Sequence, residues 1–286
     1  MLFCSLLLAG CAQPHRLDTQ PVDTSNRLSN VSYGGLLVLP YEQRSIRLAY
    51  GDDPLQFGQL YLPEPSNLSA PLVVFIHGGC WLSTYDISHS KAFSQALAAQ
   101  GFAVWSIEYR RSSDKGGGWP GSFEDVLAAL SFVDRGLAHY PVDSSRLILA
   151  GHSAGGHLAL LAAGHAYAYS ESYPYVHAVV GLAAITDLVA YASGDNSCQR
   201  ASLQFMGGTV ADIPEQYQQA NPQQQVLHPA SILLQGSTDS IVPLSQAIDS
   251  SLPYNIINDA GHFDWIHPHT QAYKQVVLTL QELLAQ

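Results

Sequence analysis

Short apolar runs alternate with longer stretches of helical periodicity along most of this chain, and this alternation limits the possible folds more than any other feature. The run at 72–76, Leu-Val-Val-Phe-Ile, is continuous, β-branched and aromatic, as expected of a strand buried on both faces. Buried strands joined by helices form a mostly parallel sheet with helices on both faces. The sequence therefore predicts an α/β fold with strands at 45–50, 58–62, 72–76, 102–109, 147–150, 178–184, 231–234 and 254–257, and with helices at 89–100, 123–139, 158–163 and 271–284.

The composition fits one large packed domain, which we place at 39–286. Of the 286 residues, 47% are hydrophobic and 12% are charged, which is too apolar for a disordered chain. The 12 Lys and Arg against 23 Asp and Glu give a net charge of −11, without a basic run. This charge gives no support for nucleic-acid binding and disfavours contact with anionic lipid surfaces.

One stretch of the domain, at 187–226, differs from the rest in amino-acid composition. It is rich in Gln, Ser, Asn and Gly, which indicates short helices and loops rather than another core strand. Inserted at the carboxyl ends of the strands, such a stretch covers a site. We therefore predict a small roof insertion at 187–226.

The first residues resemble an export signal. Residues 1–11 are apolar but too short to span a bilayer, and Leu8-Ala9-Gly10-Cys11 resembles the bacterial lipobox, in which the cysteine is lipidated. No Lys or Arg precedes the apolar run, so an ordinary cleaved signal or a buried N-terminus stays open. The polar, proline-containing residues 12–38 are typical of a flexible tether. By this resemblance the chain is lipid-anchored in the bacterial cell envelope, at the outer membrane facing the periplasm.

The cysteine count follows from this signal. With Cys4 removed and Cys11 acylated, Cys80 and Cys198 are the remaining thiols in an oxidising compartment, where pairs tend to form disulfides. We predict a disulfide between Cys80 and Cys198, with two free buried cysteines as the alternative.

A G-x-S-x-G motif at 151–155, Gly-His-Ser-Ala-Gly, lies between a predicted strand and a predicted helix. A nucleophile on a tight strand-to-helix turn needs neighbours without side chains, because the backbone must close sharply around it. The turn then exposes the serine oxygen at the start of a helix. The motif therefore predicts Ser153 as a nucleophile.

A second glycine-rich turn, His77-Gly78-Gly79-Cys80-Trp81, ends the strand at 72–76. Glycines at such a position let backbone N–H groups point into a cleft and hold a developing negative charge, as in an oxyanion hole. We predict the amides of Gly79, Cys80 and Ala154 as these donors, with a glycine-rich turn without catalytic meaning as the alternative.

A serine nucleophile needs a base, and the base needs an orienting carboxylate. His262 follows the last predicted strand, at the same sheet edge as the serine, whereas His152 and His157 fit structural roles. Asp239 follows the strand at 231–234 and fits the order of the chain. Asp187 is the rival carboxylate, although it fits a helix cap equally well.

The motifs HGGCW, GHSAGGH, GSTDSIVP and AGHFD occur in this order over nearly all of residues 40–286. The chain thereby resembles the α/β-hydrolase superfamily, in the carboxylesterase-like branch of the arylformamidase, hormone-sensitive-lipase and feruloyl-esterase-like enzymes. The resemblance implies an α/β-hydrolase fold with Ser153 as nucleophile, His262 as general base and Asp239 as its partner. Cys80 stands where the lipase relatives have a third glycine, which leaves the substrate class open.

These roles predict a serine carboxylesterase that cleaves short-chain or aryl esters through an acyl-enzyme, with a small-molecule ester as its partner and no cofactor or metal. One alternative is an amide or formamide hydrolase with the same machinery. The other is a catalytically inactive, lipid-tethered binding protein. Large side chains that fit either a substrate pocket or the core are Trp81, Trp119, Phe205, Met206 and Trp265.

Overall fold

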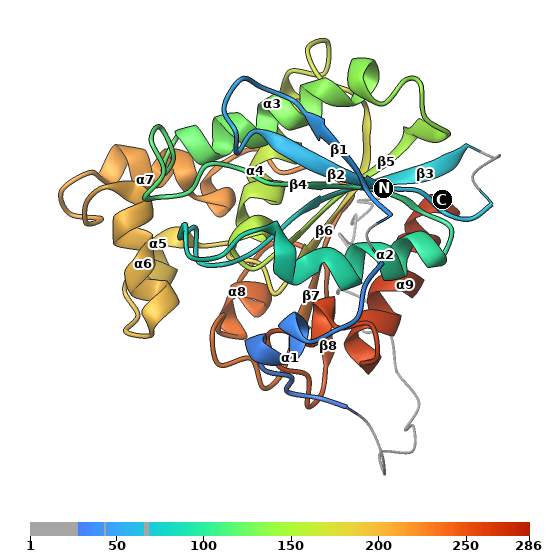
Figure 1. The fold of residues 1–286 in the computed structure, drawn as a ribbon. Coiled ribbons are helices and arrows are strands. Elements are labelled where there is room, and N and C mark those ends of the chain that lie inside the picture. The colour runs from blue at the N-terminus through green and yellow to red at the C-terminus, as the bar shows by residue number, and fades with distance from the viewer. Residues whose placement is uncertain (1–27, 43, 66–68) are drawn as a thin grey trace, which may run out of the picture.

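The computed structural model describes residues 28–286, except 43 and 66–68. An eight-stranded sheet in the order β1-β2-β4-β3-β5-β6-β7-β8 forms its centre (Figure 1). β1 and β2 pair antiparallel, β2 also runs antiparallel to β4, and β3 to β8 are parallel, as predicted for most of the sheet. The strands are β1 Ile46–Ala49, β2 Phe57–Tyr61, β3 Ala70–Ile76, β4 Ala103–Ile107, β5 Val142–His152, β6 Val176–Leu182, β7 Ser231–Gly236 and β8 Tyr254–Ile257.

Helices cover both faces of the sheet, and each face has its own hydrophobic core. α3 and α4 pack on one face, whereas α2 and α9 pack on the other. Three short 3-10 helices lie at Ile87–Ser90, Pro222–Gln224 and Asp264–Ile266. The α-helices are α1 Tyr33–Leu37, α2 Lys91–Ala99, α3 Gly121–Gly136, α4 Ala154–Ala168, α5 Leu188–Ala192, α6 Ser197–Met206, α7 Pro214–Ala220, α8 Ser245–Ile248 and α9 Gln271–Leu284.

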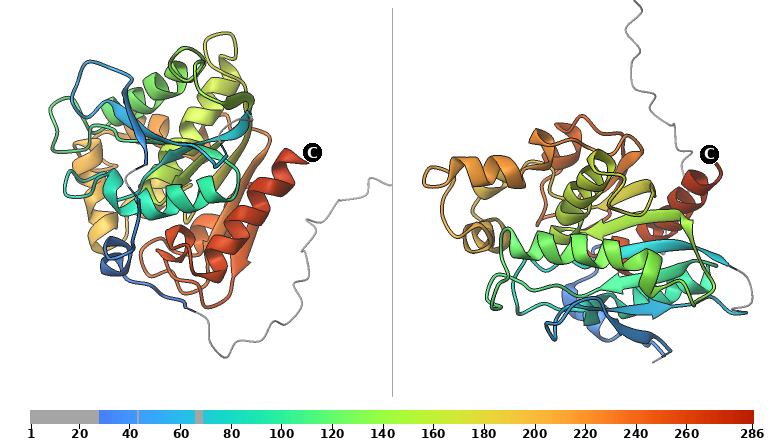
Figure 2. Two further views of the ribbon diagram at one scale, coloured as in Figure 1. Left: turned by 45° about the vertical axis from the view of Figure 1, so that its right-hand side comes forward. Right: turned by 90° about the horizontal axis from the view of Figure 1, so that it is seen from above.

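The predicted roof segment forms short helices, as its composition indicated. α5, α6 and α7 all lie within 187–226 and gather at one end of the sheet. Figure 2 shows the C-terminus near the opposite end. Tyr191, Phe205 and Tyr217 of these helices are buried in the core that α3 and α4 share, so the roof is packed onto the domain.

The end of the predicted tether is part of the domain, so the boundary at residue 39 is wrong. The amides of Asn30 and Val31 donate to the carboxylate of Asp264, both at 2.8 Å. Ser32 caps α1, and Leu36 of that helix is buried. The composition of 28–38 concealed this docking because several of its contacts are hydrogen bonds from Asn30 and Val31, which leave no hydrophobic pattern.

The predicted signal at 1–11, its lipidation site Cys11 and most of the tether lie outside the described residues, and they stay predictions. Across the described ranges, every helix is either too short or too polar to cross a bilayer.

Three buried histidines are expected to make the fold sensitive to acid. Burial lowers the pKa of His89 to about 3 and that of His157 to about 4, and it lowers the pKa of His152 well below its usual value. In the unfolded chain each imidazole gains a proton near pH 6.5, so the unfolded state binds more protons as the pH falls through that value. Between pH 7 and pH 5, His89 and His157 therefore each cost about 2 kcal/mol of the free energy of unfolding, and His152 adds a loss of the same sign.

Urea unfolding at pH 7 and pH 5 measures this loss. The variant His157→Gln is the control, since an amide at this position can still donate to a carbonyl but does not titrate. Between pH 7 and pH 5, the free energy of unfolding of the variant should fall by less than that of the wild type. Equal stability of the wild type at both pH values would contradict the account.

Candidate active site

Ser153 occupies the turn between β5 and α4, at the N-cap of the helix. Serine at an N-cap usually accepts a hydrogen bond from the first turn, but in the described structure the Ser153 side chain caps no amide. Its backbone has φ 56° and ψ −122°, a left-handed conformation that costs a residue with a β-carbon about 1 kcal/mol or more. The turn thereby leaves Oγ free of the helix, as a nucleophile requires.

Both glycines of the motif permit a close approach of main chain. A β-carbon on Gly151 would lie 2.2 Å from the carbonyl oxygen of Gly155, and one on Gly155 would lie 2.2 Å from the carbonyl oxygen of Ile76. Any larger residue would therefore force α4 away from β3 and β5. The turn is also held to the neighbouring strand, because the Ser153 amide donates to the Leu182 carbonyl of β6 at 2.8 Å.

The turn at 77–81, here called the oxyanion loop, lies directly against Ser153. A β-carbon on Gly78 would be 3.0 Å from the Ser153 β-carbon. Gly79 has φ 116°, and Cys80 and Trp81 have φ 53° and 58°. Within the described part of the chain, the amides of Gly79, Cys80 and Ala154 donate to no backbone carbonyl, which is compatible with the role predicted for them.

A buried ion pair anchors this loop, which sequence reasoning missed. The two ring nitrogens of His77 face the Gly78 carbonyl at 2.7 Å and Glu108 Oε1 at 2.9 Å. Arg111 Nη1 lies 3.2 Å from the same carboxylate oxygen. Burial alone would raise the pKa of Glu108, but hydrogen bonds and basic neighbours outweigh it, and the pKa is lowered. The sequence signal that could have found it is Glu108 itself, a carboxylate directly after β4, the strand that pairs with β3.

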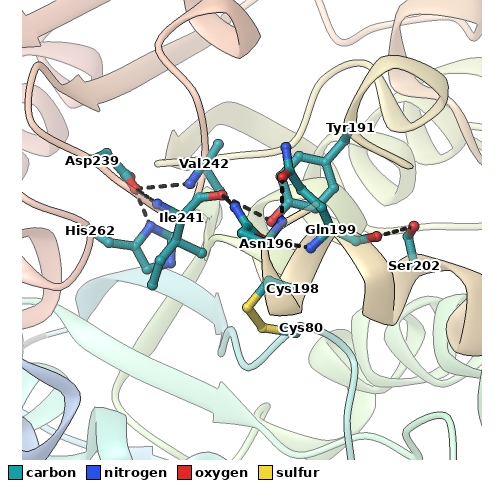
Figure 3. Close-up of a disulfide and its surroundings, with 10 residues drawn as sticks. All are labelled: Cys80, Tyr191, Asn196, Cys198, Gln199, Ser202, Asp239, Ile241, Val242 and His262. Atoms are coloured by element: carbon teal, nitrogen blue, oxygen red, sulfur yellow. Dashed lines mark hydrogen bonds and ion pairs between the residues drawn. A yellow bond between two sulfur atoms is a disulfide. The ribbon is translucent and has the colours of Figure 1, made fainter. Parts of the chain in front are cut away.

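The structure brings His262 and Asp239 together (Figure 3). His262 lies in the loop at 259–264, here called the base loop, and its Nδ1 donates to Asp239 Oδ2 at 2.8 Å. Asp239 lies in the loop at 237–243, here called the acid loop, where its Oδ1 accepts from the amides of Ile241 and Val242 at 2.8 and 2.9 Å. Both carboxylate oxygens are thus occupied, which fixes the carboxylate and the tautomer of His262.

The rival carboxylate, Asp187, has the structural role that was its alternative. Its Oδ1 accepts from the amides of Val189 and Ala190 and from Asn221 Nδ2, so it caps α5 within the roof.

His152 connects the base loop to the serine turn. Its Nε2 donates to the His262 carbonyl at 2.9 Å, and the centres of the two rings are 4.6 Å apart. Since His152 immediately precedes Ser153, this contact ties the base loop to the serine turn. His157 instead donates to Ala220 at 2.7 Å and joins α4 to the roof. Both histidines therefore serve structure, as the sequence predicted.

The proposed pocket residues form one cluster between the oxyanion loop and α6. Trp81 stacks on Phe205 at 4.7 Å between ring centres, and Trp119 meets Phe205 edge-on at 6.3 Å. Trp81, Phe205 and Met206 are buried, whereas Trp119 is partly exposed. Trp119 is thus the member best placed to reach a bound molecule. Trp265 packs in the core on the other face of the sheet.

The predicted disulfide between Cys80 and Cys198 is present; the two cysteines are 118 positions apart in the sequence, and their Cα atoms are 5.1 Å apart. It joins the oxyanion loop to the roof. No group of three His, Cys, Asp or Glu residues in the described ranges could hold a metal ion.

A protein-family model named BD-FAE matches residues 59–251, which is more than half of the chain. The chain belongs to the BD-FAE family. Over 216 residues, this BD-FAE chain is 30% identical to the esterase LipC of Mycobacterium tuberculosis. The match covers 70% of the chain and 52% of LipC, so the chain spans about half the length of this relative.

Solved structures show the fold of this BD-FAE protein. A truncated carbohydrate esterase from gut microbiota aligns with a TM-score of 0.71 and 22% identity, over 84% of this chain and 95% of that one. Esterase B from Lactobacillus rhamnosis aligns with a TM-score of 0.71 and 22% identity, over 85% of this chain and 86% of that one. The α/β-hydrolase fold predicted by resemblance is confirmed.

Proposed function

We propose that this protein is a serine esterase that cleaves short-chain or aryl carboxylic esters through an acyl-enzyme. The observation that carries the proposal is the arrangement around Ser153. The Ser153 side chain caps no amide of α4, and the amides of Gly79, Cys80 and Ala154 donate to no backbone carbonyl of the described chain. The carboxylate of Asp239 orients His262, whose carbonyl accepts a hydrogen bond from His152, the residue before the serine. This set of parts is what acyl transfer from an ester to water requires.

In the proposed reaction, His262 Nε2 takes the proton from Ser153 as Oγ attacks the ester carbonyl. Asp239 holds the proton on Nδ1, so the other ring nitrogen is free to act as the base. The amides of Gly79, Cys80 and Ala154 stabilise the oxyanion, and His262 then protonates the leaving alcohol. Water repeats the sequence on the acyl-enzyme and releases the acid.

The substrate class follows from the packing of the roof. Phe205 and Trp81 are stacked and buried, so they leave little space for a long acyl chain between α6 and the oxyanion loop. Partly exposed Trp119 offers an aromatic surface at the edge of this cluster. We therefore propose that the enzyme prefers short acyl groups or aryl esters.

Hydrolysis of p-nitrophenyl esters from acetate to decanoate tests this proposal. We expect kcat/KM to fall as the acyl chain lengthens, and a fluorophosphonate to label Ser153, as read by peptide mass spectrometry. Faster cleavage of N-formyl anilides than of the matching esters would point to the formamidase alternative. Absence of both turnover and labelling would favour a binding protein without catalysis.

A further inference from the structure

One short roof helix contacts both loops that the proposed reaction needs. α6 has Asn196 as its N-cap and Cys198 in its first turn. Cys198 is bonded to Cys80 of the oxyanion loop, and Asn196 Nδ2 donates to the Ile241 carbonyl of the acid loop at 3.0 Å. Figure 3 shows both links starting from the same turn of the helix.

The link through Asn196 reaches the base by a chain of hydrogen bonds. Tyr191 of α5 also donates to the Ile241 carbonyl, at 3.2 Å, so two roof side chains hold this peptide group. The amide of the same peptide group, that of Val242, in turn donates to Asp239 Oδ1, and Asp239 Oδ2 accepts from His262. A shift of the peptide between Ile241 and Val242 would therefore turn the carboxylate and, with it, the imidazole.

The link through Cys198 reaches the oxyanion donors. Cys80 has φ 53°, in the left-handed region that a residue with a β-carbon seldom occupies. Its side chain is buried and is covalently bound to α6. The disulfide thus helps to hold the Cys80 peptide in an orientation in which its amide faces no backbone acceptor of the described chain.

We propose that the first turn of α6 positions the active site, with the Cys80–Cys198 disulfide holding the oxyanion loop and Asn196 holding the acid loop. The inference rests on the proposed esterase function and makes that function sensitive to reductants. The side chains of Asn196 and Cys198 are positioning groups, because neither contacts the reacting atoms.

A dithiol reduces the disulfide between Cys80 and Cys198. One thiolate attacks a sulfur of the disulfide to form a mixed disulfide, and the second thiol of the reagent closes its own ring. The two electrons of the dithiol leave Cys80 and Cys198 as thiols. Of the two cysteines, Cys198 is partly exposed and Cys80 is buried.

The first test compares the full-length wild type before and after dithiothreitol with the variant Cys198→Ala. Because a small misplacement of catalytic groups costs much of the rate, we expect reduction to lower kcat for p-nitrophenyl acetate by about tenfold or more, with KM changed by less than about threefold. Cys198→Ala should show the same low kcat and no response to dithiothreitol. Reoxidation should restore the wild type.

A second variant separates positioning from helix capping. Asn196→Ser keeps an oxygen that can cap α6 but removes the Nδ2 group that donates to Ile241, so kcat should fall while thermal stability stays close to that of the wild type. Gln204→Ala is the matched control. It removes a bond from the same helix to Ser113, outside the loops of the site, and should leave kcat unchanged.

An unchanged kcat in the reduced wild type would overturn the inference and leave the disulfide a purely stabilising role. Unfolding on reduction, read by circular dichroism, would overturn it too, since the bond would then maintain the fold rather than the site. If the oxidised wild type neither hydrolyses esters nor reacts with fluorophosphonate, the proposed function fails instead. The oxidised wild type is therefore assayed first.

Discussion

The variant Ser153→Ala is expected to lose nearly all turnover of p-nitrophenyl acetate, with kcat falling by about 10⁶-fold. Alanine has no oxygen with which to attack the carbonyl, and in triad enzymes the loss of the nucleophile costs as much as the loss of the whole triad. The turn itself should persist, because alanine carries the same β-carbon at φ 56° and Ser153 Oγ caps nothing in α4.

Steady-state kinetics and thermal unfolding of both proteins measure this effect. Ser131→Ala is the matched control, since the Ser131 hydroxyl donates to Leu127 within α3, away from the site, and its kcat should equal that of the wild type. A Ser153→Ala rate within about a hundredfold of the wild-type rate would place the nucleophile elsewhere.

The variant Asp239→Asn is expected to lower kcat by about 10⁴-fold. The hydrogen bonds of the acid loop explain why. The amides of Ile241 and Val242 both donate to one side-chain oxygen, so asparagine would turn its own oxygen toward them and its NH₂ group toward His262. Nδ1 would then have to accept, the ring proton would move to Nε2, and the base would be blocked.

Asp187→Asn is the control for this experiment. Its oxygen can still accept from Val189 and Ala190 at the start of α5, so kcat should stay within about threefold of the wild type. If Asp187→Asn lowered kcat as much as Asp239→Asn does, the loss of activity would have to come from disturbance of the roof segment rather than from the tautomer of His262. Crystal structures or NMR of the imidazole protons would identify the tautomer directly.

Most of the fold could be predicted because its elements carry strong periodic patterns. β8 and α9 begin and end where the sequence placed them, and the strand at 72–76 is the buried part of β3. The motif at 151–155 predicted the tight turn at Ser153, because glycine is sterically required on both sides of that residue. Chain order separated Asp239 from Asp187, and the contacts of the two carboxylates agree with that choice.

The remaining features depend on long-range polar contacts. The bond between Asn196 and Ile241 joins residues 45 positions apart, and no local pattern marks a side chain that serves a distant peptide group. The same holds for His77 with Glu108, which are brought together by neighbouring strands. Trp81 and Phe205 were ambiguous for another reason, because core and pocket walls use the same aromatic residues.

Docking of the segment at 28–38 changes how the domain can be shortened. Asp264 accepts from Asn30, Val31 and Gly261 at the same time, so the incoming chain and the base loop share one carboxylate. Tyr33 adds an aromatic contact to Phe263, the neighbour of the histidine. A truncation near residue 39, where the composition changes, would therefore remove the contacts of Asn30, Val31 and Tyr33 with the loop that carries His262. The first described residues of this domain therefore help to hold the loop that carries the proposed base.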